Sequence, residues 1–297
     1  MAENSITGML KVFKQNFLFD YANTITTSTG SDYADNMKDL DRALYWVSVG
    51  SDDTTTETIT IEFTVAAIIS RLLLLQGNFK YFNIQYWDGA AWQDFTNVYA
   101  EGSIEGGYYG AGVYGESTYG NAGDALSAID YEINTFNSMY FEFDEVSTTK
   151  VRIEVLKTIV ADEQKYLREL YIGEEIGTFL DDLTSAPSSF SPTVSDTNSI
   201  YIKKSNGGYI KYQKSDKYVA SVEISELYEE TDQAIINDMF DEGQFAILPC
   251  GAIPYIQRGW RMSDFYSVII NGNISGEFSV GRVAEMGLVQ SFELLEQ

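Results

Sequence analysis

Four residues around one short turn have the chemistry to hold a sugar. Trp87 and Trp92 flank a turn that begins at Asp88, and Asp94 follows two residues after the second tryptophan. Indole rings offer flat apolar faces on which a sugar ring can stack, and carboxylates accept hydrogen bonds from its hydroxyl groups. These four residues are therefore the candidates for a carbohydrate-binding site, if the protein binds sugar. The alternative for each tryptophan, and for Trp46, is packing in the hydrophobic core.

A second stretch, residues 101–124, is rich in glycine and tyrosine and contains neither lysine nor arginine. Its tyrosines are Tyr108, Tyr109, Tyr114 and Tyr119. Tyrosine provides contact area and a hydroxyl at low entropy cost, and glycine lets the backbone follow a partner. We predict these tyrosines as subunit contacts, in an insertion that orders against a neighbouring subunit. Contact with a glycan and simple disorder are the alternatives.

The charge of the chain restricts its partners. Asp and Glu number 44 against 19 Lys and Arg, which gives a formal net charge of -25. Such a surface repels phosphate backbones, so we expect no direct binding of nucleic acid. The excess negative charge favours solubility, or alternatively the binding of divalent cations or of a basic partner.

The absence of histidine removes the commonest catalytic machinery. With no histidine and one cysteine, the chain has no Ser-His-Asp or Cys-His arrangement, no imidazole metal ligand and no internal disulfide. Cys250 is predicted as a buried structural thiol rather than a nucleophile. A glycoside hydrolase needs two carboxylates across a cleft, and no pair stands out in this acid-rich sequence. We therefore predict a protein that is not an enzyme and carries no organic cofactor.

No membrane insertion is expected. The longest apolar run, residues 65–75, is interrupted by Ser70 and Arg71 and is too short to span a bilayer. The first residues lack a continuous apolar stretch followed by a small-residue cleavage site, so we predict no secretory signal. We expect the protein to be made in the cytoplasm of a host cell.

Hydrophobic periodicity predicts strands throughout the first half of the chain. Residues 68–75 are apolar on both faces, apart from Ser70 and Arg71, as in a strand in the middle of a covered sheet. Four other segments alternate apolar and polar side chains, the pattern of a strand with one buried face: 58–63, 82–86, 139–143 and 151–155.

The block from residue 39 to residue 95 resembles a discoidin-like, or galactose-binding-like, β-sandwich. It contains, in the order of that family, an acidic loop, the aromatic pair Tyr45-Trp46, two strands of the ETITIEF and ISRLLLL kind, and the strand FNIQYWDGAAW. The later segment YLRELYIGEEI resembles the strand that returns beside the first one. The resemblance covers residues 31–177 and implies a jelly-roll sandwich, with 101–124 as an insertion.

The same resemblance implies a metal site. Many discoidin-like proteins hold a structural Ca²⁺ near the first loop, through carboxylate and carbonyl oxygens. In this sequence the matching loop carries Asp39 and Asp41, which are therefore the expected ligands. The alternative is a set of solvated turn carboxylates.

The remainder of the chain reads as an arm, a linker and a second domain. Residues 1–30 are expected to form an N-terminal arm that docks on its own domain or on a neighbouring subunit. Residues 181–198 contain two of the four prolines and many Ser and Thr, so we predict a linker over 178–199. For residues 200–297 we predict a smaller β-barrel or sheet with one helix. In this domain Gly207-Gly208 is expected to join two short strands as a hairpin.

The expected helix begins near Thr231 and ends at Gly243. Its apolar stripe predicts a face that packs on a sheet: Ile235, Ile236, Met239 and Phe240. The segment YEETDQAIINDMFDEG, followed by the strand QFAIL, resembles the split-barrel domains of phage tail-tube and distal-tail proteins.

Together the two resemblances imply a bacteriophage virion structural protein, a tail, baseplate or collar component located in the virion. Such a component assembles symmetrically through strand edges and loops, so the expected partners are copies of itself and other virion proteins. The alternative is a carbohydrate-binding module for attachment to a host surface, with host glycans as partners.

Overall fold

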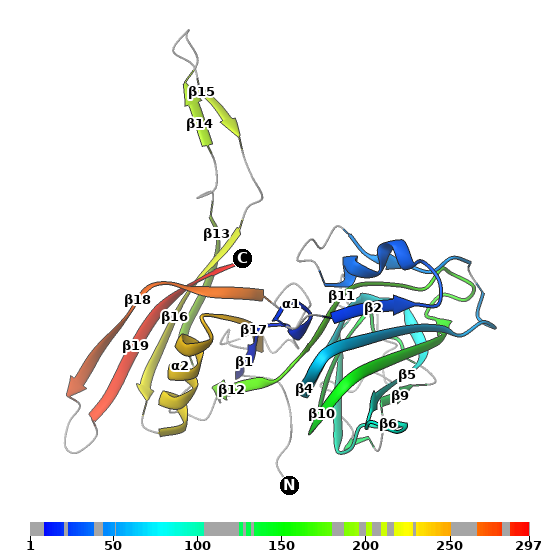
Figure 1. The fold of residues 1–297 in the computed structure, drawn as a ribbon. Helices are drawn as coiled ribbons and strands as arrows, with labels where there is room; N and C mark the ends of the chain where they lie inside the picture. The colour runs from blue at the N-terminus through cyan, green and yellow to red at the C-terminus, as the bar shows by residue number, and fades with distance from the viewer. Residues whose placement is uncertain are drawn as a thin grey trace, which may run out of the picture. The chain divides into compact units, whose positions relative to one another are not determined.

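The chain is mainly β, and its strands pair antiparallel, as the sequence predicts (Figure 1). It divides into two compact units, the first formed by Gln15–Glu175 and the second by the strand at the N-terminus together with most residues from Ile176 onward. The computed structural model describes residues 9–20, 23–38, 44–50, 52–103, 125–126, 129–131, 134–179, 187–195, 200–203, 209–212, 217–227, 230–250, 266–280 and 286–296.

The first unit contains a ten-stranded sheet that folds into two layers. Its elements are α1 (Phe17–Asp20), β2 (Asn23–Thr27), the 3₁₀ helix η1 (Ser31–Met37), β3 (Trp46–Val47), β4 (Glu57–Gly77), β5 (Phe79–Trp87), β6 (Trp92–Asp94), β7 (Val98–Ser103), β8 (Ala125–Leu126), β9 (Ile129–Tyr131), β10 (Ser138–Thr158) and β11 (Tyr166–Gly173).

The two long strands β4 and β10 belong to both layers. The first half of β4 pairs with β2 and with the second half of β10, which also pairs with β5. The second half of β4 pairs with β11 and with the first half of β10. The ladder between the two strands shifts register between Glu142 and Val146, where β10 passes from one layer to the other. The expected separate strands 58–63 and 68–75 are therefore one strand, and so are 139–143 and 151–155.

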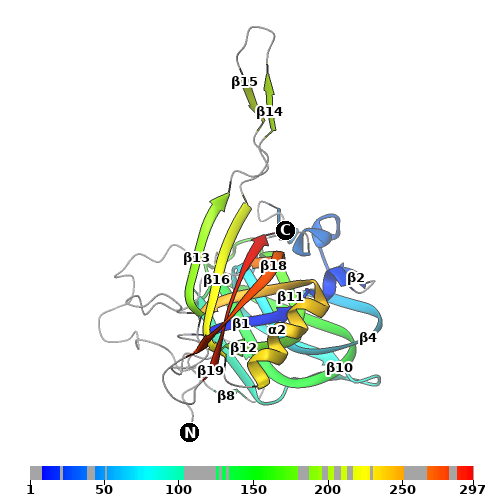
Figure 2. The same ribbon diagram turned by 90° about the vertical axis from the view of Figure 1, so that its left-hand side faces the viewer.

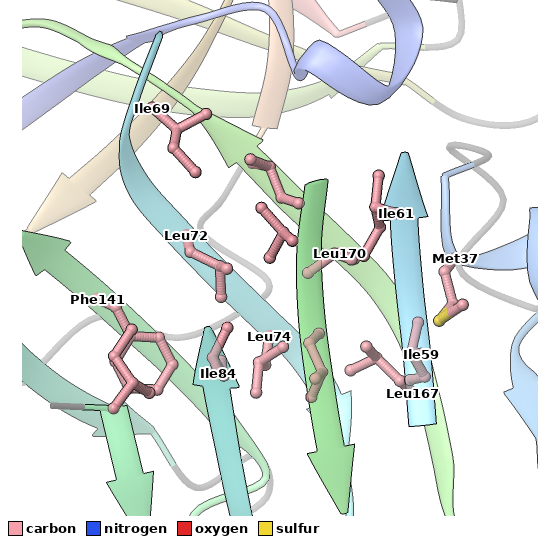
Figure 3. Close-up of a cluster of buried hydrophobic side chains, with 14 of the residues drawn as sticks. Met37, Ile59, Ile61, Ile69, Leu72, Leu74, Ile84, Phe141, Leu167 and Leu170 are labelled. Atoms are coloured by element: carbon pink, nitrogen blue, oxygen red, sulfur yellow. The ribbon is translucent and has the colours of Figure 1, made fainter. Parts of the chain in front are cut away.

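Side chains from the two layers meet in one hydrophobic core. Figure 3 shows part of this cluster, with Ile59, Ile61 and Ile84 from one layer and Ile69, Leu72, Leu74, Phe141, Leu167 and Leu170 from the other. Each fully buried side chain of this kind stabilises the fold by about 1.5–3 kcal/mol. The predicted alternation of Ile59 and Ile61 with polar neighbours is confirmed, because Ile59, Ile61 and Phe63 enter this core while Thr60 and Glu62 between them do not.

The second unit is a seven-stranded antiparallel sheet with one helix and an extra two-stranded ribbon. Its elements are β1 (Met9–Lys14), β12 (Glu175–Phe179), β13 (Pro187–Ser195), β14 (Ile200–Lys203), β15 (Tyr209–Tyr212), β16 (Lys217–Leu227), α2 (Glu230–Glu242), β17 (Gln244–Cys250), β18 (Tyr266–Val280) and β19 (Met286–Glu296). The order in the sheet is β12-β1-β17-β18-β19-β16-β13, and the predicted β14–β15 hairpin pairs as a separate ribbon (Figures 1 and 2).

Helix α2 packs beside β1 and β17 (Figure 2). Ile235, Ile236 and Met239 are buried, as the predicted apolar stripe requires. Phe240 is an exception, because its side chain is 46% exposed and lies at the edge of the buried stripe. Gly243 ends the helix with a φ of 69°, and its N–H donates to the carbonyl oxygen of Met239 at 3.3 Å.

The chain differs from the expected organisation at both borders of the first unit. The expected linker 178–199 contains β13, which pairs with β16 in the second sheet. The expected arm 1–30 contains β1, which pairs with β17, and β2, which pairs with β4. In both places the strand has a partner far away in the sequence, and such pairing leaves little signal in local composition.

Candidate aromatic surface site

Trp87 and Trp92 lie side by side at the end of the β5–β6 hairpin. The two residues are partners in the strand register, and their ring centroids are 5.4 Å apart with an interplanar angle of 68°. This edge-to-face arrangement is a favourable geometry for two aromatic rings. Both side chains are partly exposed, so the pair forms an aromatic patch at the surface rather than part of the buried cluster.

The turn that brings the two tryptophans together is held by Asp88. Its Oδ1 accepts hydrogen bonds from the N–H groups of Ala90 and Ala91, both at 2.7 Å, and its Oδ2 accepts one from Nε2 of Gln93 at 2.8 Å. These hydrogen bonds, with those from the Ala91 and Ala90 backbone first, lower the pKa of Asp88 below its ordinary value. Gly89 supplies the positive φ of 101° that the turn requires. Asp88 therefore positions the tryptophan pair, and both of its oxygens already have partners.

A cation from the neighbouring strand covers one of the rings. The guanidinium carbon of Arg152 lies 4.5 Å from the ring centroid of Trp92, within the range of a cation–π interaction. Nη2 of Arg152 donates a hydrogen bond to Oε1 of Gln85, and its Nη1 lies 3.2 Å from Oε1 of Glu154. Nε2 of Gln85 in turn donates to Oδ1 of Asp94 at 2.8 Å. Polar groups from three strands thus surround the tryptophan pair.

The inner face of the same hairpin is anchored in the core. The rings of Tyr86 and Phe95 are 5.2 Å apart, and those of Phe95 and Phe143 are 4.1 Å apart. The backbone of Trp87 is fixed by Thr148, whose Oγ1 accepts from the Trp87 N–H at 3.2 Å and donates to the Trp87 carbonyl at 2.8 Å. The aromatic patch therefore stands on a rigid base.

Sequence reasoning did not select Arg152 or Gln85. The period-2 pattern places Gln85 on the same face as Trp87, which was a usable signal. The position of Arg152 follows from the pairing of β10 with β5, in which Arg152 is opposite Gln85. These two residues are 67 positions apart in the chain, so no local pattern brings them together.

Trp46 is not part of any surface site. Its side chain is completely buried, and its Nε1 donates a hydrogen bond to the carbonyl oxygen of Thr29 at 3.2 Å. The alternative of core packing is the one that the structure shows for this residue.

The other predicted site residues lie outside the part of the chain that the structure describes: Tyr108, Tyr109, Tyr114, Tyr119, Asp39 and Asp41. Their roles as subunit contacts and Ca²⁺ ligands stay predictions. Among the described residues, no group of three or more acidic or cysteine side chains is arranged to hold a metal ion. In the first acidic loop, Oδ1 of Asp35 lies 2.8 Å from Nζ of Lys38.

Both carboxylates of the next acidic loop accept hydrogen bonds from the protein itself. Oδ1 of Asp52 accepts hydrogen bonds from the hydroxyl of Thr54 at 2.8 Å and from the N–H groups of Thr54 and Thr55 at 2.9 Å and 2.6 Å. These bonds, the Thr54 hydroxyl first, lower the pKa of Asp52 to about 2. Oδ1 of Asp53 accepts from the N–H and the hydroxyl of Thr158, both at 3.0 Å. Asp52 thus closes the turn before β4, and Asp53 connects this turn to the end of β10.

No helix within the described ranges is both long and apolar enough to cross a bilayer. The apolar run 65–75 lies in β4.

Comparison with known proteins gives matches among solved structures alone. No protein-family model matches the chain, and no curated protein matches it. CpGH89CBM32-6 of Clostridium perfringens is 14% identical with a TM-score of 0.36, and the match covers 54% of this chain and 99% of that one. A chitosan-binding module from a chitosanase/glucanase of Paenibacillus sp. IK-5 is 13% identical with a TM-score of 0.37, over 54% of this chain and 98% of that one.

A fucosidase of Ruminococcus gnavus, solved in complex with fucose as a mutant, is 12% identical with a TM-score of 0.37. The match covers 55% of this chain and 27% of the fucosidase. At such identities and TM-scores, these likenesses assign no ligand, activity or partner to this chain.

Proposed function

We propose that the first unit is a carbohydrate-binding module and that its ligand lies on the outer face of β5, β6 and the second half of β10. One observation carries the proposal: the partly exposed Trp87–Trp92 pair, with Arg152 stacked on it and Gln85 and Asp94 beside it. A rigid aromatic patch bordered by a few polar groups is the usual composition of a small-ligand site.

The geometry divides the work between the two tryptophans. Arg152 occupies a face of the Trp92 ring, so Trp92 serves mainly to hold Trp87 and the guanidinium in place. Trp87 is then the main ring on which a sugar stacks. Gln85, Asp94 and Arg152 supply hydrogen-bond acceptors and donors for the hydroxyl groups around the sugar ring. Asp88 acts through the turn rather than by contact, because its oxygens are already bonded.

The experiment is a glycan array with the full chain, followed by calorimetry on the oligosaccharides that bind. Trp87→Ala should weaken binding by about 2 kcal/mol, or about thirtyfold, since aromatic anchors dominate such sites. Tyr33→Ala is the matched control, because it removes another exposed aromatic ring, 51% exposed on η1, and should leave binding unchanged. Saturable binding that Trp87→Ala does not weaken, or no binding to any glycan, would contradict the proposal.

The proposed module binds its glycan without cleaving it. No release of reducing ends is expected when the bound oligosaccharides are incubated with the protein. The virion role stays a separate prediction, because its expected contact residues lie outside the described residues. Assembly into a symmetric particle would be measured by the oligomeric state of the full chain.

A further inference from the structure

The outer face of β5 continues from the tryptophan pair to a pocket. This pocket has a volume of about 150 Å³. It is lined by Thr56, Tyr81, Phe82, Asn83, Glu154 and Leu156. In the strand register Asn83 is opposite Glu154, and the Gln85–Arg152 pair is the next pair on the same face, two residues further along each strand. The pocket therefore lies on the same strand pair as the proposed sugar site.

Asn83, which lines this pocket, has a side-chain oxygen that lacks a hydrogen-bond partner among the described residues. This Oδ1 atom is buried. An unsatisfied buried acceptor costs about 1–3 kcal/mol, so such an atom is uncommon unless something outside the protein bonds to it. The hydroxyl group of a bound molecule is a donor of suitable size.

The spacing along β5 fits a chain of sugars rather than a single one. Asn83 and Trp87 are four residues apart on the same face, which corresponds to about 13 Å along a strand. Gln85 lies between them, with Arg152 beside it. The polar groups are thus continuous from the pocket to the aromatic patch.

The charge of the pocket selects among sugars. Glu154 and the buried Oδ1 of Asn83 both accept hydrogen bonds, so the pocket favours a sugar residue that presents hydroxyl donors. The neighbouring cation Arg152 is already paired with Glu154 at 3.2 Å. A uronic acid would bring a carboxylate next to Glu154 on a chain with a net charge of -25, which opposes its binding.

We propose that this pocket is a second subsite of the same surface, in which Asn83 Oδ1 accepts a hydrogen bond from one residue of a neutral oligosaccharide whose other end stacks on Trp87. The inference rests on the proposed function, and it adds the length and the charge class of the ligand.

The test compares binding with stability in Asn83→Leu. Neutral and uronic acid oligosaccharides, from disaccharides to hexasaccharides, are titrated against the full chain and the variant. The neutral hexasaccharide should lose about five- to tenfold in affinity, while the disaccharide, which reaches Trp87 alone, should bind as before. The melting temperature should not fall, because the lost oxygen has no partner among the residues that the structure describes.

Asn134→Leu is the matched control for the stability measurement. The Asn134 side chain is also buried, but it donates to the carbonyl oxygens of Phe79 and Phe136 and accepts from the Phe136 N–H. Asn134→Leu should therefore lower the melting temperature clearly. Asn83→Ala, which removes the amide without adding bulk at the pocket wall, is measured alongside and should repeat the binding result of Asn83→Leu.

The outcomes separate the two proposals. A melting temperature that falls in both Asn83 variants as it does in Asn134→Leu overturns the second subsite, because Asn83 then has a structural partner. Unchanged hexasaccharide affinity in either variant, or tighter binding of the uronic acid series, also overturns it while the Trp87 site stands. Failure of every oligosaccharide to bind the unmodified chain rejects the proposed function itself.

Discussion

The two halves of β4 belong to one continuous strand but carry different outer faces. In the first half the side chains that point away from the core are Thr58, Thr60 and Glu62, and all three are at least partly exposed. In the second half the outward positions include Leu73 and Leu75, and both are fully buried. The backbone pairing is the same in kind, and the two halves differ in the burial of their outward side chains: the first half has an open face and the second half a closed one.

One arginine is associated with each half of β4, and the two arginines have different surroundings. Arg71 lies in the second half of β4, and Arg152 lies in β10 opposite Thr60 of the first half. Arg71, in the closed half, donates from Nε to Oε2 of Glu175 at 2.7 Å and lies 3.2 Å from Oε1 of Glu142, with its side chain 13% exposed. Arg152, beside the open half, stacks on Trp92 at the surface. The two arginines thus differ in their surroundings: Arg71 is enclosed by two carboxylates, whereas Arg152 has one carboxylate partner and lies in a surface patch with a partly exposed ring.

The largest expected effect comes from breaking the closed half. Arg71→Met leaves Glu175, whose side chain is also 13% exposed, without its main cation. Removal of one partner of such a buried pair costs about 3 kcal/mol or more, because the other charge stays desolvated. We expect a loss of this size in the free energy of unfolding, measured by urea denaturation.

Arg152→Met is the control from the open half. It removes a cation–π contact and a partly exposed ion pair, which together contribute about 1 kcal/mol. The double change Arg71→Met with Glu175→Met should recover part of the loss, since the Glu175 carboxylate that has lost Arg71 is then removed as well. Equal losses for the two arginines would remove the distinction between closed and open halves.

A smaller effect is expected from the hydroxyl of Tyr140. This side chain is fully buried on β10 in the closed half, and its hydroxyl donates to Oε2 of Glu142 at 3.1 Å. Tyr140→Phe removes this bond and should lower the free energy of unfolding by about 1–2 kcal/mol. Tyr81→Phe, at a partly exposed tyrosine of the open face, should change it very little. A comparable loss in both variants, again by urea denaturation, would contradict the comparison.

Burial raises the pKa of Tyr140 well above its ordinary value. The folded protein therefore keeps this proton at a pH where the unfolded chain, with a pKa of about 10, releases it. The contribution to stability is present below pH ~10 and is lost as the pH rises above that value. Stability measured from neutral to alkaline pH should fall less steeply in Tyr140→Phe than in the unmodified chain.

The sequence predicts the faces of the strands well because the alternation of side chains is a local property. Ile59 and Ile61 enter the core together for this reason, and so do Phe82 and Ile84. It does not predict that 58–63 continues into 68–75, since the passage of β4 between the layers depends on partners in β10 and β11. The sequence also does not predict the strand β13, because β13 is defined by its pairing with β16, which lies further along the chain.

The candidate site also has a part that the sequence predicts and a part that it does not. The Asp-Gly turn and its flanking tryptophans are a local signal, and Trp87 and Trp92 do lie together at the surface. The position of Arg152 over Trp92 and the pocket at Asn83 depend on which strand lies beside β5. Composition and spacing hold no information on such a pairing.

The smallest effect is expected in the turn that leads into the open half, where Asp52 has a pKa of about 2. A lowered pKa stabilises the fold above the ordinary value of 3.8, and this contribution is lost as the pH falls from about 4 toward 2. Thr54→Val removes the largest cause, the Thr54 hydroxyl, and keeps the backbone N–H groups of Thr54 and Thr55. The pKa of Asp52 should therefore rise part of the way toward 3.8.

The measurement is an NMR titration of the Asp52 carboxyl carbon in the unmodified chain and in Thr54→Val. Thr56→Val is the control, since it removes a neighbouring exposed hydroxyl that does not bond to Asp52 in the structure. Because the Asp52 carboxylate is exposed to solvent, the melting temperature at neutral pH should change much less in Thr54→Val than in Arg71→Met. An Asp52 pKa that is the same in Thr54→Val as in the unmodified chain would show that the backbone N–H groups alone lower it. A fall in melting temperature as large as that of Arg71→Met would show that this turn contributes as much to stability as the closed half of β4.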